Sequence, residues 1–428
     1  MEKKKKLIRI TTVPLSLKKL LEGQLGFING FYKVTAMCSD LNSLKEVGKQ
    51  EDVAIYELPL KRTINPFLDL YAILKLYSFL RKEQPFIVHT HTPKAGLVGM
   101  LAAWLARVPH RLHTVAGLPL LETNDLKRFI LDAVEKLTYA CATHIYPNSY
   151  GLYNIILENK YTTAKKLNVI ANGSSNGINT AYFSPKTVTE VQKKILRFEL
   201  DINEHDFVFI FVGRLVGDKG INELVAAFQM LQNQQQATGN REKTTDFSLS
   251  SRAESMDTSL FSLSSRAESR DTSHNIKLLL VGPLESDLYP LLPNTLANIA
   301  SDYNILSVGY QNDIRPYLVI SNALVFPSYR EGFPNVVMQA GAMGLPSIVT
   351  NINGCNEIII EGVNGTIIPV KNTQALVEAM QKMVSDTTYH NHLQQNARAM
   401  IMERFEQQQV WEALLAEYHR LEKTILKR

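Results

Sequence analysis

Short apolar runs alternate with stretches of helical periodicity along the first half of the chain. Six of the runs predict strands buried on both faces, at residues 7–12, 32–38, 53–56, 86–89, 111–115 and 145–146. The segments between them carry apolar residues at helical spacing, at 18–28, 67–79, 94–107, 126–141 and 154–159. Strands that alternate with helices need crossover connections, and crossovers give a parallel sheet. The first half therefore predicts a Rossmann-like α/β domain.

The second half of the chain repeats this alternation. Apolar runs predict six further strands, at 207–212, 277–281, 305–308, 323–326, 347–350 and 365–368. Helical patterns lie at 221–231, at 336–343 and from 373 onward, with a long one at 408–426. A turn cluster at 172–177, followed by Pro185, separates the two halves. We expect an α/β fold with one Rossmann-like domain over 1–185, a second over 186–400, and a helix within 401–428.

One segment of the second half does not share this rhythm. Residues 247–255 recur at 261–269, and the repeat as a whole spans 247–272. The repeat is rich in serine and poor in apolar residues, so it buries too little surface to fold alone. Two short copies are also too few for a repeat architecture. We expect residues 235–275 to form a disordered surface insertion between a helix and the next strand.

Composition narrows the class of protein. The chain has 428 residues, 45% of them hydrophobic and 20% charged, which is typical of globular proteins. Its net charge of +5 is not concentrated, so we expect no nucleic-acid partner. The 3 cysteines show neither a disulfide framework nor metal-ligand spacing. No apolar run approaches the roughly 20 residues of a membrane span. These features favour a cytoplasmic protein. The lysines at 3–6 are interpreted as a solvated terminus, with contact to anionic lipid as the alternative.

The segment 323–346 predicts a strand at 323–326, a glycine-containing loop from 328 and a helix at 336–343, in succession. Pro334 suits the first turn of that helix, where a missing N–H costs nothing. The free N–H groups of a helix N-terminus attract phosphate. Glu331 precedes this helix, and its carboxylate repels phosphate but accepts hydrogen bonds from hydroxyl groups. A sugar diphosphate offers both kinds of group.

Two basic residues and several histidines are further candidates for chemistry. Arg214 and Lys219 lie in the turn after the second half's first strand, where they suit a pyrophosphate leaving group. His113 lies near the carboxyl end of a strand, where open α/β sheets bind ligands. His89 and His91 are spaced like metal ligands, but no third ligand is evident, and His91 or Thr92 facing the acceptor is the favoured interpretation. No dinucleotide fingerprint, phosphate loop or Asp-x-Asp motif is present, so we expect neither metal nor cofactor.

Together, the motifs at 88–96, 113–117, 172–178, 213–220 and 331–335 resemble the retaining glycosyltransferase family 4. That resemblance implies a GT-B fold, with two Rossmann-like domains facing across a cleft and a C-terminal helix that crosses back to the first domain. It implies that Glu331 contacts the donor sugar, that Arg214 and Lys219 bind its diphosphate, and that His113 lies near the sugar. The family's second glutamate is replaced here by Gln339, which we expect at the ribose. The expected donor-binding residues are Gly213, Arg214, Lys219, Tyr310, Glu331, Gly332, Phe333, Pro334, Asn335 and Gln339.

The resemblance is strongest to bacterial enzymes of capsule, lipopolysaccharide and glycan assembly. It implies transfer of a hexose or N-acetylhexosamine from a nucleotide diphosphate, UDP in the first instance, to an undecaprenyl-diphosphate-linked glycan at the inner face of the membrane. Two alternatives stay open. One is a GT-B-fold UDP-N-acetylglucosamine 2-epimerase, which needs no acceptor. The other is a non-catalytic nucleotide-binding scaffold, suggested by Gln339 and the insertion.

Overall fold

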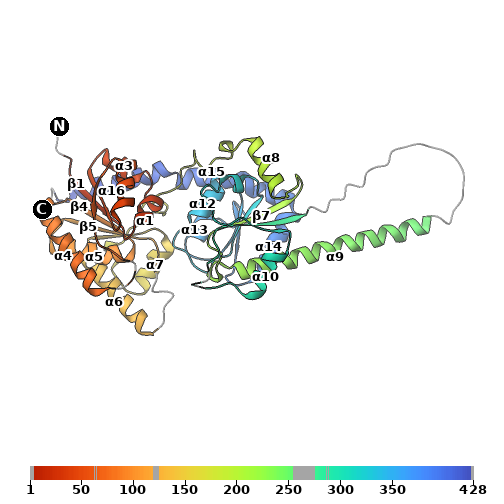
Figure 1. Ribbon diagram of the computed structural model, residues 1–428, viewed down its shortest axis with the longest axis horizontal. Helices are drawn as coiled ribbons and strands as arrows, with labels where there is room; N and C mark the ends of the chain where they lie inside the picture. The colour runs from red at the N-terminus through yellow and green to blue at the C-terminus, as the bar shows by residue number, and fades with distance from the viewer. Residues whose placement is uncertain are drawn as a thin grey trace.

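The chain folds into two α/β domains that lie side by side (Figure 1). The computed structural model describes residues 4–61, 63, 65–118, 125–253, 275–285, 287 and 289–425; of 125–127, 238–253 and 425 it describes the backbone only. Each domain is built on a six-stranded sheet whose strand pairs are all parallel. The predicted α/β class is therefore confirmed.

The two sheets share one topology. Their strand orders are β3-β2-β1-β4-β5-β6 and β12-β11-β10-β7-β8-β9. In each sheet the order in which strands are added reverses once, beside the first strand of that domain. All twelve predicted strands are present. The first sheet consists of β1 (Lys6–Ile10), β2 (Lys33–Cys38), β3 (Ala54–Glu57), β4 (Ile87–His91), β5 (His110–Val115) and β6 (His144–Pro147). The second consists of β7 (Phe207–Val212), β8 (Ile276–Val281), β9 (Ile305–Ser307), β10 (Ala323–Phe326), β11 (Ser347–Thr350) and β12 (Gly365–Ile368).

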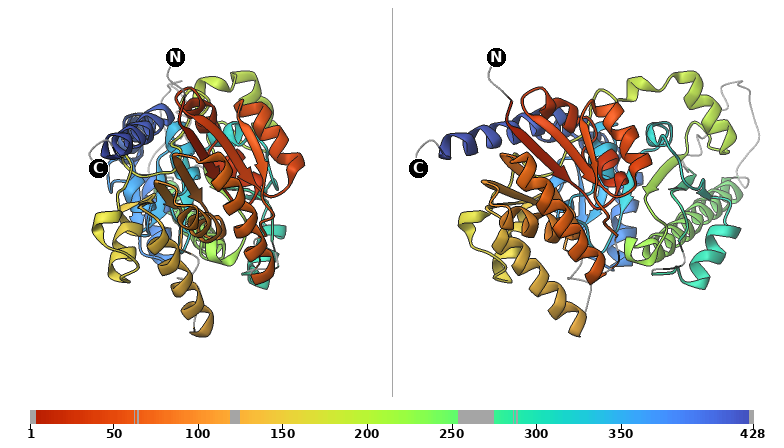
Figure 2. Two further views of the ribbon diagram at one scale, coloured as in Figure 1. Left: turned by 90° about the vertical axis from the view of Figure 1, so that its left-hand side faces the viewer. Right: turned by 60° about the vertical axis from the view of Figure 1, so that its left-hand side comes forward.

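Helices cover both faces of the first sheet. They are α1 (Pro14–Leu20), α2 (Gln24–Asn29), α3 (Leu41–Glu51), α4 (Pro66–Glu83), α5 (Pro93–Leu105), α6 (Asp125–Cys141) and α7 (Tyr150–Glu158). The single helix predicted at 18–28 is wrong, because the chain breaks at Gly23, whose φ of 76° is left-handed. Figure 2 shows α4, α5 and α6 in neighbouring positions, and α5 packs against both of the others.

The second domain carries a larger set of helices. They are α8 (Glu190–Glu199), α9 (Ile221–Ala253), α10 (Pro293–Ser301), α11 (Arg315–Val319), α12 (Asn335–Ala342), α13 (Cys355–Ile358), α14 (Thr373–Ser385) and α15 (Thr387–Phe405). The disorder expected from residue 235 is wrong for its first part, because α9 continues to Ala253 and extends away from the domain (Figure 1). Glutamine is a good helix former, and the four glutamines within 232–236 favour continuation of the helix. Residues 254–274, which hold the second copy of the repeat, lie outside the described residues.

Small residues bring α5 close to the first sheet. A methyl group added at Gly99 would collide with Thr90 on β4, and one added at Gly96 would collide with the ring of His113 on β5. This close approach leaves the His113 side chain only 2% exposed. The Gly/Ala-rich sequence of α5 therefore fixes the position of a residue that the motifs single out.

The last helix, α16 (Gln407–Ile425), returns to the first domain. Its Leu414, Leu415, Tyr418 and Leu421 belong to the same buried cluster as residues of β1 and β2. The Tyr418 hydroxyl accepts a hydrogen bond from the buried guanidinium of Arg9 at 2.6 Å and bonds His89 at 2.6 Å. Figures 1 and 2 show the helix running beside β1. In contrast, α15 and Ile178 pack into the core of the second domain.

Candidate active site

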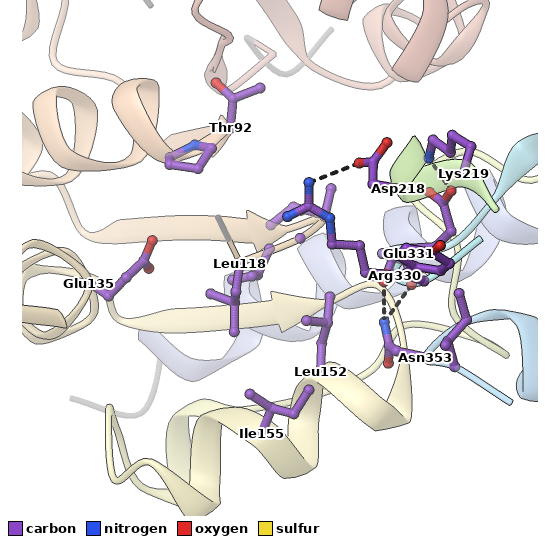
Figure 3. A pocket seen from close by; sticks show the side chains of 18 of the residues that line it. Thr92, Leu118, Glu135, Leu152, Ile155, Asp218, Lys219, Arg330, Glu331 and Asn353 are labelled. Carbon is purple, nitrogen blue, oxygen red and sulfur yellow. Dashed lines mark hydrogen bonds and ion pairs between the residues drawn. The ribbon is translucent and has the colours of Figure 1, made fainter. Parts of the chain in front are cut away.

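A cavity of about 550 Å³ lies between the carboxyl ends of the two sheets (Figure 3). The first domain lines it with residues that follow β4 and β5, such as Thr92 and Leu118, and with side chains of α6 and α7. The second domain lines it with residues that follow β7, β10 and β11, such as Arg214, Glu331 and Asn353. Ligands of open α/β sheets bind at this edge, so the cavity is the candidate active site.

An ion pair forms the centre of the second-domain wall. Lys219 donates a hydrogen bond to Glu331, and each side chain is 17% exposed. The Ser328 hydroxyl donates a second bond to the same carboxylate at 3.0 Å. The 3-10 turn Gly217–Lys219 supplies the ammonium, and the loop after β10 supplies the carboxylate. The two residues singled out by the motifs thus meet in the cavity.

Two further charged pairs flank this centre. Arg330 donates to Asp218 at 2.9 Å, and the guanidinium also lies over the ring of Tyr289. Arg214 lines the cavity and donates to Glu285 at 3.0 Å. The Arg214–Glu285 pair is far more exposed than the central one, with side chains 45% and 41% exposed. Sequence reasoning missed Asp218 and Arg330, although each is adjacent to a residue that it selected.

The loop that carries Glu331 is held in close contact with the first domain. The side-chain amide of Asn353 donates to the carbonyl oxygens of Glu331 and Gly332, at 3.1 and 2.6 Å. A methyl group added at Gly332 would collide with the carbonyl oxygen of Ala116, across the cleft. Only glycine allows the two backbones to approach this closely, so Gly332 sets the width of the cavity at that point.

The N-terminus of α7 forms a second contact between the domains. The Glu357 carboxylate accepts hydrogen bonds from the backbone N–H groups of Tyr150 and Gly151, at 2.7 and 2.9 Å. The Ser149 hydroxyl donates to Asn353 at 2.8 Å. A carboxylate at a helix N-terminus is favourably placed in the field of the helix dipole. The Asn353 side chain therefore contacts both the loop that carries Glu331 and Ser149 of the first domain.

The first-domain wall carries polar groups of a different kind. The ring of His113 lines the cavity and bonds the Thr90 hydroxyl through Nδ1 at 2.8 Å. Burial lowers the pKa of His113 to about 4, because a charged imidazolium would lose its hydration. The ring is neutral at pH 7, so it can bind a sugar hydroxyl but contributes no charge. Leu118, Leu152 and Ile155 add apolar side chains to this wall.

Glu135 is the only carboxyl group among the described residues that this wall contributes. It projects from α6 into the cavity and is 6% exposed. The pKa of Glu135 is raised to about 7, chiefly by burial; a hydrogen bond from the Tyr139 hydroxyl lowers it in part, and the nearby charge of Asp132 makes a smaller contribution that raises it. The helical pattern of 126–141 gives no sign of this, because Glu135 looks like one more polar position on an amphipathic helix.

Several of the predicted residues do not line the cavity. Tyr310 is 64% exposed in the loop after β9, and Gln339 is half-buried on α12. Phe333 packs its ring against Phe405 in the core of the second domain. Pro334 caps α12, Asn335 begins it, and Gly213 directly precedes Arg214. The residues of the donor set that do line the cavity are Arg214, Lys219, Glu331 and Gly332.

Of the two residues expected to face the acceptor, His91 and Thr92, only Thr92 lines the cavity. His89 and His91 are both buried, their rings stack at a centroid distance of 4.5 Å, and His89 is bonded to Tyr418 of α16. Across the described part of the chain, no group of three His, Cys, Asp or Glu side chains is placed to hold a metal ion. Likewise, none of the described helices is both long and apolar enough to span a bilayer.

Family models match both domains. Residues 30–173 match the glycosyl transferase 4-like domain, and residues 238–400 match the glycosyl transferases group 1 model. The chain is 29% identical to the capsular polysaccharide biosynthesis glycosyltransferase CapM of Staphylococcus aureus, over 97% of each chain. It is 26% identical to the UDP-Gal:alpha-D-GlcNAc-diphosphoundecaprenol alpha-1,3-galactosyltransferase of Escherichia coli, over 88% of this chain and 86% of that protein.

A solved structure shares the fold. The crystal structure of Anabaena HepE in complex with UDP and glucose superposes with a TM-score of 0.74 and 15% sequence identity, over 97% of this chain and 100% of that one. At this identity the likeness concerns the arrangement of the two domains.

Proposed function

The chain belongs to the GT-B glycosyltransferases, with a 4-like domain ahead of a group 1 domain, and on that premise we propose that it moves a sugar from a uridine diphosphate donor to a lipid-linked glycan, with retention at the anomeric carbon. The observation that carries the proposal is the meeting of Lys219, Glu331 and Arg214 in one cavity between the domains. Relatives named for capsule and undecaprenol-linked glycan synthesis support this class of acceptor.

The donor binds along the second-domain wall. Lys219 and Arg214 neutralise the charge that grows on the diphosphate as it leaves, and Glu331 accepts hydrogen bonds from the sugar hydroxyls. Both cations are now paired with carboxylates, and a diphosphate offers each of them an anion of higher charge. The N–H groups around Gly332 and the N-terminus of α12 add donors, and Gln339 and Tyr310 are the proposed contacts of the ribose and the base.

The acceptor binds along the first-domain wall, which lies opposite. The bond between the anomeric carbon and the phosphate oxygen breaks, and a bond to the acceptor oxygen forms on the same face of the sugar. The acceptor's proton passes to the departing phosphate oxygen, so the step balances without a separate protein base. Neutral His113 suits a place beside the donor sugar, because it can bond a hydroxyl without attracting the diphosphate.

A donor screen tests the proposal. Purified protein is incubated with a panel of UDP and GDP sugars and a bacterial membrane lipid extract, and the released nucleotide and the glycosylated lipid are both measured. We expect UDP release with one donor, and only when lipid is present. Conversion of UDP-N-acetylglucosamine without lipid would instead indicate an epimerase. UDP binding without turnover of any donor would indicate a scaffold.

We further propose that the first domain docks on the membrane that carries the acceptor. Phe67, Leu70, Tyr71 and Leu74 project from α4 at spacings of three and four residues, and they are 56–88% exposed. They therefore form one solvent-facing apolar stripe. Exposed Arg81 and Lys82 follow on the same helix, and basic residues beside an apolar stripe favour an anionic lipid surface.

A vesicle assay tests this docking. We expect the protein to sediment with vesicles containing phosphatidylglycerol and much less with pure phosphatidylcholine. The double variant Leu70→Ser, Leu74→Ser should lose most of that binding. The matched control is Val191→Ser on α8 of the second domain, which is also well exposed and should bind like wild type. Equal sedimentation of all three proteins would contradict docking through α4.

A further inference from the structure

Glu135 differs from every other buried carboxylate in the described part of the chain. Five other acidic residues are less than a tenth exposed, and each has a basic side chain or a backbone N–H as a partner: Glu51, Asp69, Asp206, Asp218 and Glu417. Glu135 has no basic partner and no backbone N–H donor among the described residues; only the Tyr139 hydroxyl, one turn further along α6, influences it. Buried carboxylates normally obtain such partners from the fold, because an unpaired one is costly.

The carboxyl group is directed into the candidate active site. Glu135 lines the same cavity as Lys219 and Glu331, and Figure 3 shows it at the opposite end of that cavity from those two residues. The donor wall can supply a diphosphate site without it. The end of the cavity at Glu135 is the part that the donor-binding residues do not occupy.

The cavity wall that carries Glu135 is largely apolar. Leu118, Leu152 and Ile155 lie on the same wall, and Figure 3 shows Leu118 between Glu135 and the donor side. A sugar ring has apolar C–H faces and a rim of hydroxyl groups. An apolar wall with one hydrogen-bond acceptor at its end matches this pattern, whereas a phosphate would be repelled by the carboxylate.

We propose that Glu135 binds a hydroxyl group of the acceptor sugar, while Leu118 and Leu152 pack against the face of its ring. This inference rests on the proposed function and assigns to it an acceptor subsite. Ionised Glu135 accepts the hydrogen bond, and the bound hydroxyl adds a second donor beside the Tyr139 hydroxyl. Glu135 is a positioning residue, because it holds the acceptor and takes no part in the bond exchange.

The local chemistry of the carboxyl group agrees with a role in binding. The pKa of Glu135 is raised to about 7, chiefly by burial, so its ionised form is poorly stabilised until a further hydrogen-bond donor binds. A hydroxyl that donates to the ionised form stabilises it, and charge-assisted bonds of this kind are among the stronger ones in proteins. The affinity for a sugar hydroxyl is therefore increased because Glu135 has no basic partner in the described part of the protein.

Steady-state kinetics with two substrates tests the subsite. The probe acceptor is undecaprenyl-diphosphate-linked N-acetylglucosamine in detergent micelles, with the UDP sugar found in the donor screen. We expect Glu135→Ala to raise the acceptor KM about ten- to hundredfold, as loss of a hydrogen bond to a charged group predicts. The donor KM and the Kd for UDP should change less than about twofold. Glu135→Gln keeps an oxygen that can accept a hydrogen bond, so it should show a smaller rise in the KM for the acceptor substrate.

The control is Glu417→Gln, which removes a buried carboxylate on α16, outside the cavity. It should lower the melting temperature and leave the acceptor KM unchanged. An unchanged acceptor KM in folded Glu135→Gln and Glu135→Ala, with active wild-type protein, would overturn the subsite and leave the proposed function standing. If wild type binds UDP but glycosylates no lipid acceptor, the proposed function is overturned and the subsite with it.

Discussion

The two walls of the cleft come from domains of the same topology but differ in their electrostatics. The second-domain wall presents basic and acidic side chains already paired, as in Lys219 with Glu331 and Arg330 with Asp218. The first-domain wall presents apolar side chains, a neutral His113 and the isolated Glu135. One wall is suited to exchange its own carboxylates for an anionic ligand, and the other to bind a neutral, hydroxyl-rich one. The difference supports our proposal that the domains divide donor and acceptor between them.

The largest effect is expected when Lys219, the central cation of the second-domain wall, is removed. Lys219→Ala should lower kcat by about a hundredfold or more, because it withdraws charge stabilisation from the leaving diphosphate. Arg214→Ala should act in the same direction. Initial rates at saturating donor measure the effect, with Lys193→Ala on α8 as the control lysine. A kcat near that of wild type in both cavity variants would show that the diphosphate binds elsewhere.

The acceptor wall makes a prediction about pH. The folded-state pKa of Glu135 is raised to about 7 from an ordinary value of 4.5, so its protonation stabilises the fold below pH 4.5 and that stability is lost as pH rises through 7. Glu135→Gln removes this loss. The variant should gain less than about 1 kcal/mol in the free energy of unfolding at pH 5 and about 3 kcal/mol at pH 8. Urea unfolding at the two pH values measures it; a gain independent of pH would contradict the raised pKa.

The contact between the walls can be disturbed at one backbone atom. Gly332→Ala places a methyl group against the carbonyl of Ala116, so the domains must separate slightly. We expect kcat to fall at least tenfold, because small misplacements of reacting groups are costly. Gly117→Ala, in the same contact, meets no atom within 4 Å and should have a much weaker effect. Equal rates for the two variants would show that the cleft works in a more open form.

The smallest expected effect concerns the ribose. Gln339→Glu should lower the donor KM by about threefold, because a carboxylate accepts a stronger hydrogen bond from a ribose hydroxyl than an amide oxygen does. Initial rates at varied donor concentration, with UDP as a competitor, measure the donor KM. Gln339 lies outside the cavity lining, so an unchanged KM would place the ribose away from α12 and leave the donor wall otherwise intact.

Sequence patterns predicted the strands far better than the details of the site. Buried parallel strands such as β7 and β8 are continuous apolar runs, which stand out without any tertiary information. The break between α1 and α2 at Gly23 was missed, because the apolar spacing continues across it. The predicted helix N-terminus at Pro334 holds to within one residue, since proline restricts where a helix can begin.

Within the site, motifs identified residues whose chemistry is unusual for their place in the chain. Lys219 and Glu331 are distant in sequence, and only the resemblance to a family joined them before the structure did. Arg330 and Asp218 look like ordinary loop charges, and their pairing depends on how two loops meet. Glu135 could not have been predicted, because its lack of a basic partner depends on how α6 packs against α5 beside the cavity.

The return of α16 has a consequence for biosynthesis. The first domain has its sheet complete once β6 is made, yet Arg9 and His89 obtain their Tyr418 partner only when residues near 418 have left the ribosome. Until then, the surface that will receive Leu414 and Leu421 stays exposed to solvent or to chaperones. A chain cut short before residue 407 would carry both sheets and still present that unfinished surface, a mark by which degradation machinery could recognise it.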